Sequence, residues 1–508
     1  MLARIPSASV IGIDGYMLTV EVDVRHGMPA IIIVGLPDTA VKESKDRVES
    51  AIRNSGYSMP SDHITINYAP GDVKKEGPAF DLPTALGLLA ASGQLQSDLL
   101  DKYAAVGELA LDGALRPVRG CLAAAMAVRQ AGLKGFIVPA ANANEAGVVA
   151  GLDVISVGSL AEVMGFLSGQ LLLEPVQVKL EDIFEDSRSY DVDFAEVRGQ
   201  EAAKRALTVA AAGGHNVLMV GPPGSGKTLL SRRLPSILPP LGLEESLETT
   251  RIYSSVGLLK PGQSILATRP FRSPHHTVSH GGLVGGGSVP TPGEVSLAHN
   301  GVLFLDELPE FDKKTLEVLR QPLEDGVVTI TRVQGSLTFP AAITLIAALN
   351  PCPCGYFGAP RHECRCTPRQ IQAYMGRISG TLLDRIDIHI EVPAVAYRDL
   401  RSDQTGATSA DLRKQVISAR DHQRTRFSAD RTNARMSPRE VRKFCKLDEQ
   451  GEALLKQASQ ELGLSARAHD KILRLSRTIA DLEGAPDIRL THLSEAVQYR
   501  RLDRNMFA

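Results

Sequence analysis

The pattern of hydrophobic and polar positions separates two stretches that alternate strands with helices from a final helical stretch. In the first stretch, short apolar runs predict strands and longer periods predict helices, as at 30–34, 63–67, 38–55 and 120–132. Residues 194–393 alternate in the same way, apart from a Gly/His/Pro-rich segment at 270–293. From residue 409 onward the period is helical. The pattern predicts an α/β fold with a helical C-terminal region.

The chain has 508 residues, which is more than one hydrophobic core usually organises. A charge-rich stretch of mixed character separates the two α/β parts. We therefore expect an N-terminal domain, a linker, an α/β core and a helical lid with C-terminal domain, at residues 1–170, 171–193, 194–395 and 396–508. Ser437, followed by Pro438 and Glu440, predicts a capped helix start, and Ser465 and Thr491 are further predicted caps.

Composition narrows the class of protein. No stretch approaches about 20 uninterrupted apolar residues, so a membrane span is not expected. The first six residues lack the apolar segment of a secretory signal, and six cysteines are too few for a disulfide scaffold of this size. These features predict a cytoplasmic protein. Residues 396–508 carry 22 Lys and Arg against 16 Asp and Glu, whereas residues 1–175 carry 13 against 19. The basic part is typical of a polyanion-binding region or of solvated helix faces.

A phosphate-binding loop is the strongest local motif. The eight residues from Gly221 to Thr228 follow the apolar run 217–220 and precede a helical stretch, which is the context that a P-loop requires. Backbone N–H groups of such a loop bind phosphate oxygens, and the following helix N-terminus adds a favourable dipole. The predicted nucleotide-binding residues are Gly221, Pro222, Pro223, Gly224, Ser225, Gly226, Lys227 and Thr228. Lys227 is expected along the β- and γ-phosphates, and Thr228 on Mg²⁺.

Two later apolar runs end in the polar residues that ATP hydrolysis needs. The run 301–305 is followed by Asp306 and Glu307, expected at the end of a neighbouring strand. Asp306 would hold the metal, and Glu307 would polarise the attacking water. The run 341–349 ends in Asn350, an amide suited to sensing the γ-phosphate. The second carboxylate favours hydrolysis over simple nucleotide binding.

These motifs together resemble those of a AAA+ ATPase. The stretches Pro292–Glu307 and Leu382–Asp387 are similar to the magnesium-chelatase motor subunit and, more distantly, to the MCM helicases. With the N-terminal domain and the cysteines described below, nearly the whole chain resembles the YifB/ComM family. The resemblance implies a bacterial P-loop AAA+ protein that uses ATP and Mg²⁺ and is linked to natural transformation. Its ComM type is a hexameric DNA branch-migration helicase, so DNA and further copies of the chain are the implied partners.

The resemblance also assigns two arginines. Arg385 matches the arginine finger that reaches the ATP of the neighbouring subunit, where it stabilises developing charge. The alternative is a surface arginine paired with Asp384 or Asp387. Arg467 matches the second sensor at the start of a lid helix, and its alternative is a solvated helix-face charge.

Residues 326–339 predict a β-hairpin with Arg332 near its tip. In the related helicases such a hairpin points into the central pore, so Arg332 is the candidate for gripping a DNA backbone. The alternative is an edge-strand charge that blocks aggregation. His275, His276 and His280 share no Cys or carboxylate neighbour in the sequence, so we expect a mobile loop near the pore or a subunit interface instead of a metal site.

The N-terminal domain resembles the Lon protease domain without its chemistry. The segment Lys75–Asp81 and the stretches 107–113 and 120–139 carry the similarity. The position of the Lon serine is Ala79, and that of its lysine aligns with Ala124. A methyl group cannot attack a carbonyl, so the chain is predicted not to be a protease. The domain is expected to serve ring assembly or partner contact, or to be a scaffold.

Four of the six cysteines follow Asn350 directly, as two C-x-C pairs, at Cys352, Cys354, Cys364 and Cys366. Four thiols in two pairs suit tetrahedral Zn²⁺, although the spacing within each pair is tighter than usual, and His362 is an alternative ligand. Reduced thiols and a redox role remain open as other interpretations. For the whole chain, we predict an ATP-driven ring motor acting on DNA. The alternative is a chelatase-like motor that remodels a protein partner.

Overall fold

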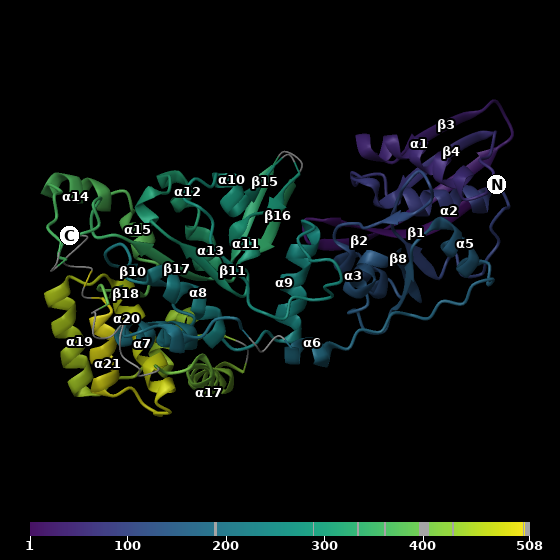
Figure 1. The fold of residues 1–508 in the computed structure, drawn as a ribbon. Coiled ribbons are helices and arrows are strands. Elements are labelled where there is room, and N and C mark those ends of the chain that lie inside the picture. The colour runs from purple at the N-terminus through teal and green to yellow at the C-terminus, as the bar shows by residue number, and fades with distance from the viewer. Residues whose placement is uncertain are drawn as a thin grey trace. The chain divides into compact units, whose positions relative to one another are not determined.

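The computed structural model describes residues 1–186, 190–287, 289–332, 335–359, 362–395, 406–428, 431–500 and 502. The chain forms two compact units (Figure 1). Unit 1 contains Met1–Asp186 and Gly242–Ala267, and unit 2 contains Ser187–Leu241 and Thr268–Ala508. None of the helices in these ranges is long and apolar enough to cross a membrane.

Unit 1 is built first around a four-stranded sheet in the order β1-β2-β4-β3. Its strands are β1 (Leu2–Ile11), β2 (Asp14–Arg25), β3 (Ala30–Val34) and β4 (His63–Ala69), of which only β3 and β4 run parallel. Alternate residues of β4, Ile64, Ile66 and Tyr68, are buried, as expected for a sheet with one covered face. Helices α1 (Thr39–Asn54) and α2 (Asp81–Ala91) pack with this sheet in one core. The strands and helices predicted for this region are confirmed.

A second, parallel sheet completes the N-terminal part of unit 1. Its strand order is β5-β8-β9. Strands β6 and β7, which fall between β5 and β8 in the sequence, form a separate short hairpin. The bounds are β5 (Tyr103–Ala105), β6 (Glu108–Leu109), β7 (Leu115–Arg116), β8 (Gly135–Pro139), β9 (Asp153–Val157), α3 (Cys121–Gln130), α4 (Ala143–Ala146), α5 (Leu160–Leu167) and α6 (Leu180–Asp186). Helix α6 falls inside the stretch that the sequence analysis treated as a linker.

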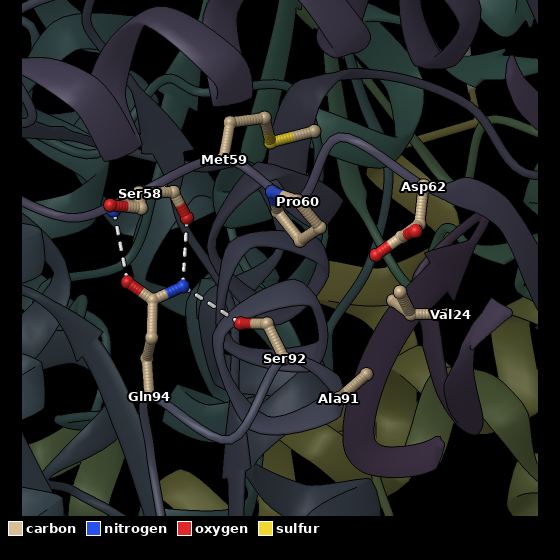
Figure 2. A pocket seen from close by; sticks show the side chains of 8 residues that line it. All are labelled: Val24, Ser58, Met59, Pro60, Asp62, Ala91, Ser92 and Gln94. Carbon is tan, nitrogen blue, oxygen red and sulfur yellow. Dashed lines mark hydrogen bonds between the residues drawn. The ribbon is translucent and has the colours of Figure 1, made fainter. Parts of the chain in front are cut away.

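A surface pocket of unit 1 lies between β2 and the end of α2 (Figure 2). Gln94 closes one side: its amide accepts from the backbone N–H of Ser58 at 2.9 Å and donates to Ser92 at 2.8 Å. The only carboxylate among the lining residues is Asp62. None of the lining residues belongs to the predicted sites, so the candidate chemistry lies elsewhere.

Helix α9 (Leu243–Ser255) belongs to unit 1 although it follows the P-loop in the sequence. The buried carboxylate of Glu145 accepts from the Ser254 hydroxyl and from the Leu122 backbone N–H. The Gly120 N–H donates to the Ser254 carbonyl at 3.0 Å, and Arg251 pairs with Asp14 at 2.6 Å. These contacts attach α9 to α3 and the β1–β2 turn. The sequence pattern did not predict this insertion.

Unit 2 contains a five-stranded parallel sheet in the order β11-β14-β17-β10-β18. Its strands are β10 (Val217–Val220), β11 (Phe271–Arg272), β14 (Val302–Leu305), β17 (Thr344–Leu349) and β18 (Ile388–Glu391). Strands β10 and β14 are buried at every position, as is typical of a parallel sheet covered on both faces. Helices α7 (Glu201–Gly213) and α8 (Lys227–Ile237) contribute to the same core.

Short elements decorate the sheet of unit 2. Two hairpins pair β12 with β13 and β15 with β16. The bounds are α10 (His280–Val284), β12 (Gly285–Gly286), β13 (Thr291–Pro292), α11 (Glu294–Leu297), α12 (Lys313–Glu317), α13 (Arg320–Asp325), β15 (Val327–Arg332), β16 (Gly335–Pro340), α14 (Pro368–Met375) and α15 (Gly380–Leu383). The predicted hairpin is confirmed as β15–β16, and Val333 and Gln334 at its tip lie outside the described residues.

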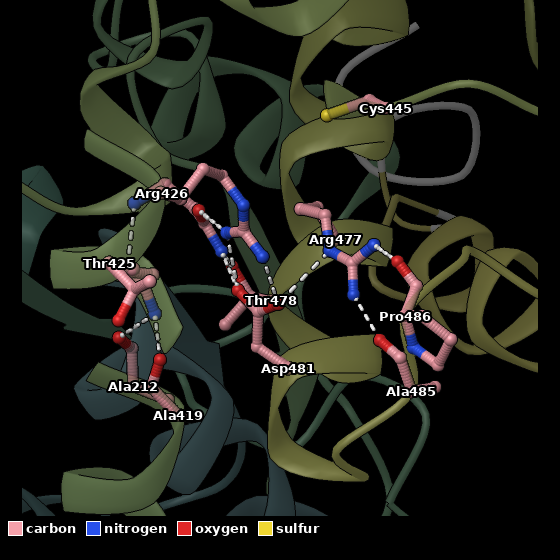
Figure 3. A network of polar contacts seen from close by, with 12 residues as sticks. Ala212, Ala419, Thr425, Arg426, Cys445, Arg477, Thr478, Asp481, Ala485 and Pro486 are labelled. Atoms are coloured by element: carbon pink, nitrogen blue, oxygen red, sulfur yellow. Dashed lines mark hydrogen bonds and ion pairs between the residues drawn. The ribbon is translucent and has the colours of Figure 1, made fainter. Parts of the chain in front are cut away.

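The helical lid follows as α17 (Ser409–Phe427), α18 (Pro438–Phe444), α19 (Glu449–Leu462), α20 (Ala466–Leu482) and α21 (Leu490–Gln498). Ser437 and Ser465 cap α18 and α20 as predicted. Thr491 is not a cap, because α21 begins one residue earlier, after Arg489. Arg426 of α17 pairs with buried Asp481 of α20 at 2.5 Å (Figure 3), which joins the two helices. The predicted fold class, an α/β P-loop core with a helical lid and an α/β N-terminal domain, is confirmed.

Candidate nucleotide site and cysteine cluster

The phosphate loop connects β10 to α8. Two glycines allow the backbone conformation and the close approach that this loop needs. Gly226 caps α8 with φ +95°, a conformation that L side chains rarely adopt. Gly221 approaches the chain so closely that a Cβ there would lie 2.1 Å from the carbonyl oxygen of Val392. The loop therefore ends at a helix N-terminus, which is the arrangement that binds phosphate.

Lys227 is 7% exposed, and its ammonium is held by three oxygens. Its Nζ donates to the carbonyls of Gly221 at 2.7 Å and Pro222 at 3.0 Å, and to the Oδ1 of Asn350 at 3.2 Å. Burial lowers the pKa of Lys227, and the nearby Asp306 and Glu307 oppose that shift. The structure thus places the predicted lysine and the predicted sensor amide in direct contact.

The two residues predicted to hold Mg²⁺ also meet. The hydroxyl of Thr228 donates to Asp306 Oδ2 at 2.7 Å. Strand β14, which delivers Asp306, is not adjacent to β10, because β17 with Asn350 at its end lies between them. The prediction that Asp306 follows a strand adjacent to β10 is therefore wrong by one strand. The crossover connections set the order of the strands in the sheet. Hydroxyl and carboxylate oxygens suit Mg²⁺, so this pair fits the metal.

Glu307 is exposed and has φ +52°, a left-handed conformation that is uncommon for a residue with a side chain. Its Oε2 lies 3.5 Å from Nδ1 of His276. The ring of His276 lies tilted against the ring of His275, with 4.1 Å between centroids, and makes an edge contact with Phe311 at 6.4 Å. The histidine segment thus reaches the carboxylate predicted to polarise water, and its place near a pore or a subunit interface stays a prediction. The parallel pairing of β11 with β14 brings the two segments together, and no local motif signals it.

Tyr374 of α14 is a second neighbour that the sequence analysis missed. Burial raises the pKa of Tyr374 to about 12, the charges of Glu310 and Glu307 add to the shift, and a hydrogen bond to the backbone of Asn350 opposes it. The phenol therefore stays protonated beside the sensor residue. Nothing in the sequence around Tyr374 marks it.

The three arginines predicted to act outside this centre lie at separate places in unit 2. Arg385 follows α15 and pairs with Glu324, not with the Asp384 or Asp387 of the alternative interpretation. Arg467 is exposed in the first turn of α20. Arg332 is exposed at the end of β15, where its Nε donates to the Gly287 carbonyl at 3.3 Å. None of the three touches the phosphate loop in the contacts of the described chain.

A buried charged network holds the segment that carries Arg385 against the lid. Asp387 accepts from Lys471 of α20 at 3.0 Å and from His215 at 3.3 Å. Burial alone would raise the pKa of Asp387, but Lys471 and His215 outweigh it and hold the pKa well below its ordinary range. The carbonyl of Arg385 accepts from Asn216 at 3.0 Å. The predicted finger and the lid are therefore coupled through ionised side chains.

The four cysteines form a compact cluster. Their sulfur atoms all lie within 4.8 Å of one another, and Cys352 is 3.3 Å from Cys354 and 3.7 Å from Cys364. A disulfide needs a sulfur separation of about 2.05 Å, whereas a tetrahedral site with Zn–S bonds of about 2.3 Å has sulfurs about 3.8 Å apart. A backbone N–H of Phe357 also points at the Cys352 sulfur at 3.3 Å. The donor set therefore fits a closed tetrathiolate metal site.

Two further features of the cluster bear on its chemistry. A backbone hydrogen bond from Tyr356, with further bonds from Cys352 and Arg365, lowers the pKa of Cys354 to about 6. His362, the alternative ligand, instead packs its ring against Tyr356 in a tilted arrangement, with 4.7 Å between centroids. Cys121 and Cys445 are buried and lie outside the cluster.

Comparison with known proteins covers both units. The descriptions "Magnesium chelatase, subunit ChlI", "Subunit ChlI of Mg-chelatase" and "Magnesium chelatase, subunit ChlI C-terminal" match residues 193–400, 20–142 and 406–500. The uncharacterized protein YifB of Salmonella typhimurium is 45% identical over 99% of this chain and 98% of its own length. The competence protein ComM of Haemophilus influenzae is 43% identical over the same shares. The chain belongs to the YifB/ComM family.

Membership in this family confirms the resemblance stated from the motifs. The family is of the ChlI type, so the chain is an AAA+ ATPase, and ATP with Mg²⁺ are its implied cofactors. Lon protease 2 of Bacillus subtilis is 30% identical over 125 residues, which are 24% of this chain and 22% of that protein. The N-terminal unit is accordingly Lon-like.

Proposed function

We propose that the chain is an ATP-driven ring motor that moves along DNA, as a branch-migration helicase of the ComM type. The contact of Thr228 with Asp306, beside the exposed carboxylate of Glu307, is the observation that carries the ATPase part. One carboxylate can hold Mg²⁺ while the other polarises water. Lys227 would bind the γ-phosphate and Asn350 would sense it, with Arg467 contributing from the lid. Similarity to a competence protein favours DNA as the partner.

The β15–β16 hairpin supplies a surface suited to DNA. One face is buried at Val328, Ile330 and Phe339, which anchors the hairpin to unit 2. The other exposes a ladder of hydroxyls, with Thr329–Thr338 at 3.2 Å and Thr331–Ser336 at 2.8 Å. Arg332 ends β15 on the face of Ile330 and is itself exposed. Hydroxyl and guanidinium groups contact phosphate oxygens without reading bases, as a translocating motor requires.

The proposal includes a homo-oligomeric, hexameric ring in the cytoplasm. Arg385 would then break its ion pair with Glu324 and act on the ATP of the neighbouring subunit. Zn²⁺ in the cysteine cluster would be structural, because four thiolates leave no open position for catalysis.

The test measures steady-state ATPase rates without DNA and with single-stranded, duplex and four-way-junction DNA, using Glu307→Gln as the blank. We expect stimulation that is greatest on branched DNA. Arg332→Ala should bind DNA more weakly on every sequence and with a shallower salt dependence. Arg25→Ala, which removes an exposed arginine of unit 1, is the matched control and should behave like the wild type.

ATP hydrolysis that responds to no DNA would overturn the DNA part of the proposal and leave the ATPase part standing. That outcome would favour a chelatase-like motor that remodels a protein partner, in keeping with the matched family descriptions.

A further inference from the structure

The cysteine cluster lies against the phosphate loop. A Cβ built on Gly355 would lie 2.5 Å from Cδ and 2.7 Å from Cγ of Pro223, so the Gly355 backbone packs directly against the ring of Pro223. Gly355 follows Cys354 directly, and its N–H donates to the Cys352 carbonyl at 2.9 Å. The turn that carries two of the four thiols is therefore also the turn that packs on the nucleotide site.

Two more contacts link the same short segment to the phosphate loop. The Gly221 N–H donates to the carbonyl of Leu349 at 3.2 Å, and Lys227 Nζ donates to Asn350 at 3.2 Å. The segment 349–355 thus meets the first residue, the second proline and the lysine of the phosphate loop. Cys352 and Cys354 lie inside that segment, whereas Cys364 and Cys366 approach it from 362–366.

We infer that a divalent zinc ion held by the four thiolates is a positioning element of the ATP site, because it fixes the turn that supports Pro223 and Asn350. The inference rests on the proposed ATPase function and names a metal that acts at a distance from the reacting atoms. Without the ion, the described bonds from residues 349–355 to the second cysteine pair and its neighbours are thiol contacts and the Arg365 backbone bond to Cys354, which are weaker than metal–thiolate bonds. The support under Pro223 and the angle of Asn350 then loosen together.

Metal content is the first measurement, made on the full chain. One zinc per chain is expected, and Co²⁺ in its place should give the charge-transfer and ligand-field bands of a tetrahedral tetrathiolate site. Cys364→Ser and Cys366→Ser should lose both. Cys445→Ala, which removes a thiol outside the cluster, should keep both. A wild-type chain with no zinc and no tetrathiolate cobalt spectrum would overturn the metal assignment.

Nucleotide affinity is the second measurement, read by binding of a fluorescent ATP analogue. Chelation of the metal should weaken binding by about tenfold or more, since small misplacements of binding groups have effects of this size, and added Zn²⁺ should restore it. Recovery on zinc addition separates this effect from misfolding. Unchanged affinity after complete metal loss would overturn the coupling.

Two glycines of the loop test the contact without touching a thiol. Gly355 and Gly358 have φ +86° and +76°, so alanine strains both alike, but a Cβ on Gly358 meets nothing within 4 Å. Gly355→Ala should keep its zinc and still lose about tenfold or more in nucleotide affinity. Gly358→Ala should stay close to the wild type in both. Equal losses in the two variants would show that the Pro223 contact is not the route.

Failure of the proposed function gives a different result. A zinc-loaded wild-type chain that binds no ATP analogue would contradict the ATPase site itself, whatever the metal does.

Discussion

The two units of this chain each bury an aspartate, and the pKa values of the two carboxyl groups are shifted in opposite directions. In unit 2, Asp387 is ionised beside Lys471 and His215, and these partners hold its pKa low. In unit 1, Asp81 is fully buried and paired with Arg47 at 2.9 Å, yet burial outweighs the pairing and raises its pKa to about 6. A buried carboxylate stays charged where a buried lysine and an imidazole face it, and resists ionisation where its one cation is partly solvated.

The two units also differ in the side chains that occupy their candidate catalytic positions. In unit 2, Lys227 donates to Asn350, and the adjacent Thr228 donates to Asp306. Unit 1 has methyl groups at Ala79 and Ala124, and Ala124 is buried in a packed core. An active centre needs polar side chains that the fold must support, whereas a scaffold can replace them by apolar packing.

The largest expected effect contrasts these positions. Glu307→Gln should lower kcat for ATP hydrolysis by about 10²–10⁴-fold with nucleotide binding retained, because an amide cannot polarise water as a base. Ala79→Ser, the matching change in unit 1, should leave ATPase unchanged and create no peptidase, since Ala124 offers no lysine. Steady-state ATPase and a casein digest measure both. Full hydrolysis by Glu307→Gln would remove Glu307 from its assigned role.

The second-largest effect is expected when the charged network of Asp387, Lys471 and His215 in unit 2 is broken. Asp387→Asn should lower the free energy of unfolding by about 3–5 kcal/mol, because Lys471 would remain buried without its carboxylate. Chemical denaturation, with hydrogen exchange to locate the effect in unit 2, is the measurement. Asp387→Asn/Lys471→Met is the control and should recover much of the loss. Equal destabilisation in both variants would show that the ion pair is not the cause.

The pH dependence of Asp81 sharpens the comparison. The pKa of Asp81 is raised from 3.8 to about 6 on folding. The contribution of this group to the free energy of unfolding is therefore fully present below pH 3.8 and is lost as the pH rises through 6. The stability of the wild type relative to Asp81→Asn should therefore fall by about 3 kcal/mol over that window. The pKa of Asp387 is shifted the other way, so the effect of Asp387→Asn should stay constant over the same window. Parallel denaturation curves at each pH check both, and a flat profile for Asp81 would contradict its raised pKa.

The smallest effects are expected at helix starts. Asp38 caps α1 in unit 1, accepting from Val41, and Ser465 caps α20 in unit 2, accepting from Ala468. Alanine at either position should cost about 1 kcal/mol of stability. Asp38 also accepts from Gly77 at 3.2 Å, so its replacement should be the more harmful of the two. A larger loss at Ser465 would reverse that order.

Much of the candidate site was predictable because its signals are local. A P-loop needs glycines, lysine and threonine at set spacing, and the acidic pair follows an apolar run, so Thr228 and Asp306 were assigned before their contact was known. Ser437 and Ser465 were predicted as caps for the same reason. The prediction of Thr491 as a cap was wrong because the local signal lies two residues past the true cap position, which Arg489 occupies.

The contacts that were missed all join distant segments. His276 reaches Glu307 through the pairing of β11 with β14, and α9 joins unit 1 through Glu145 and Ser254. Local periodicity carries no information on strand order or on which core an insertion joins.

The sequence by itself determined the two α/β parts, the lid helices, the nucleotide motifs and the four-thiol donor set, since each depends on spacing along the chain. Only the tertiary structure decided that β17 separates β10 from β14, that Asp387 meets Lys471, and that Gly355 rests on Pro223. Those arrangements follow from how whole elements pack, because side chains far apart in the chain meet only when the core brings their elements together.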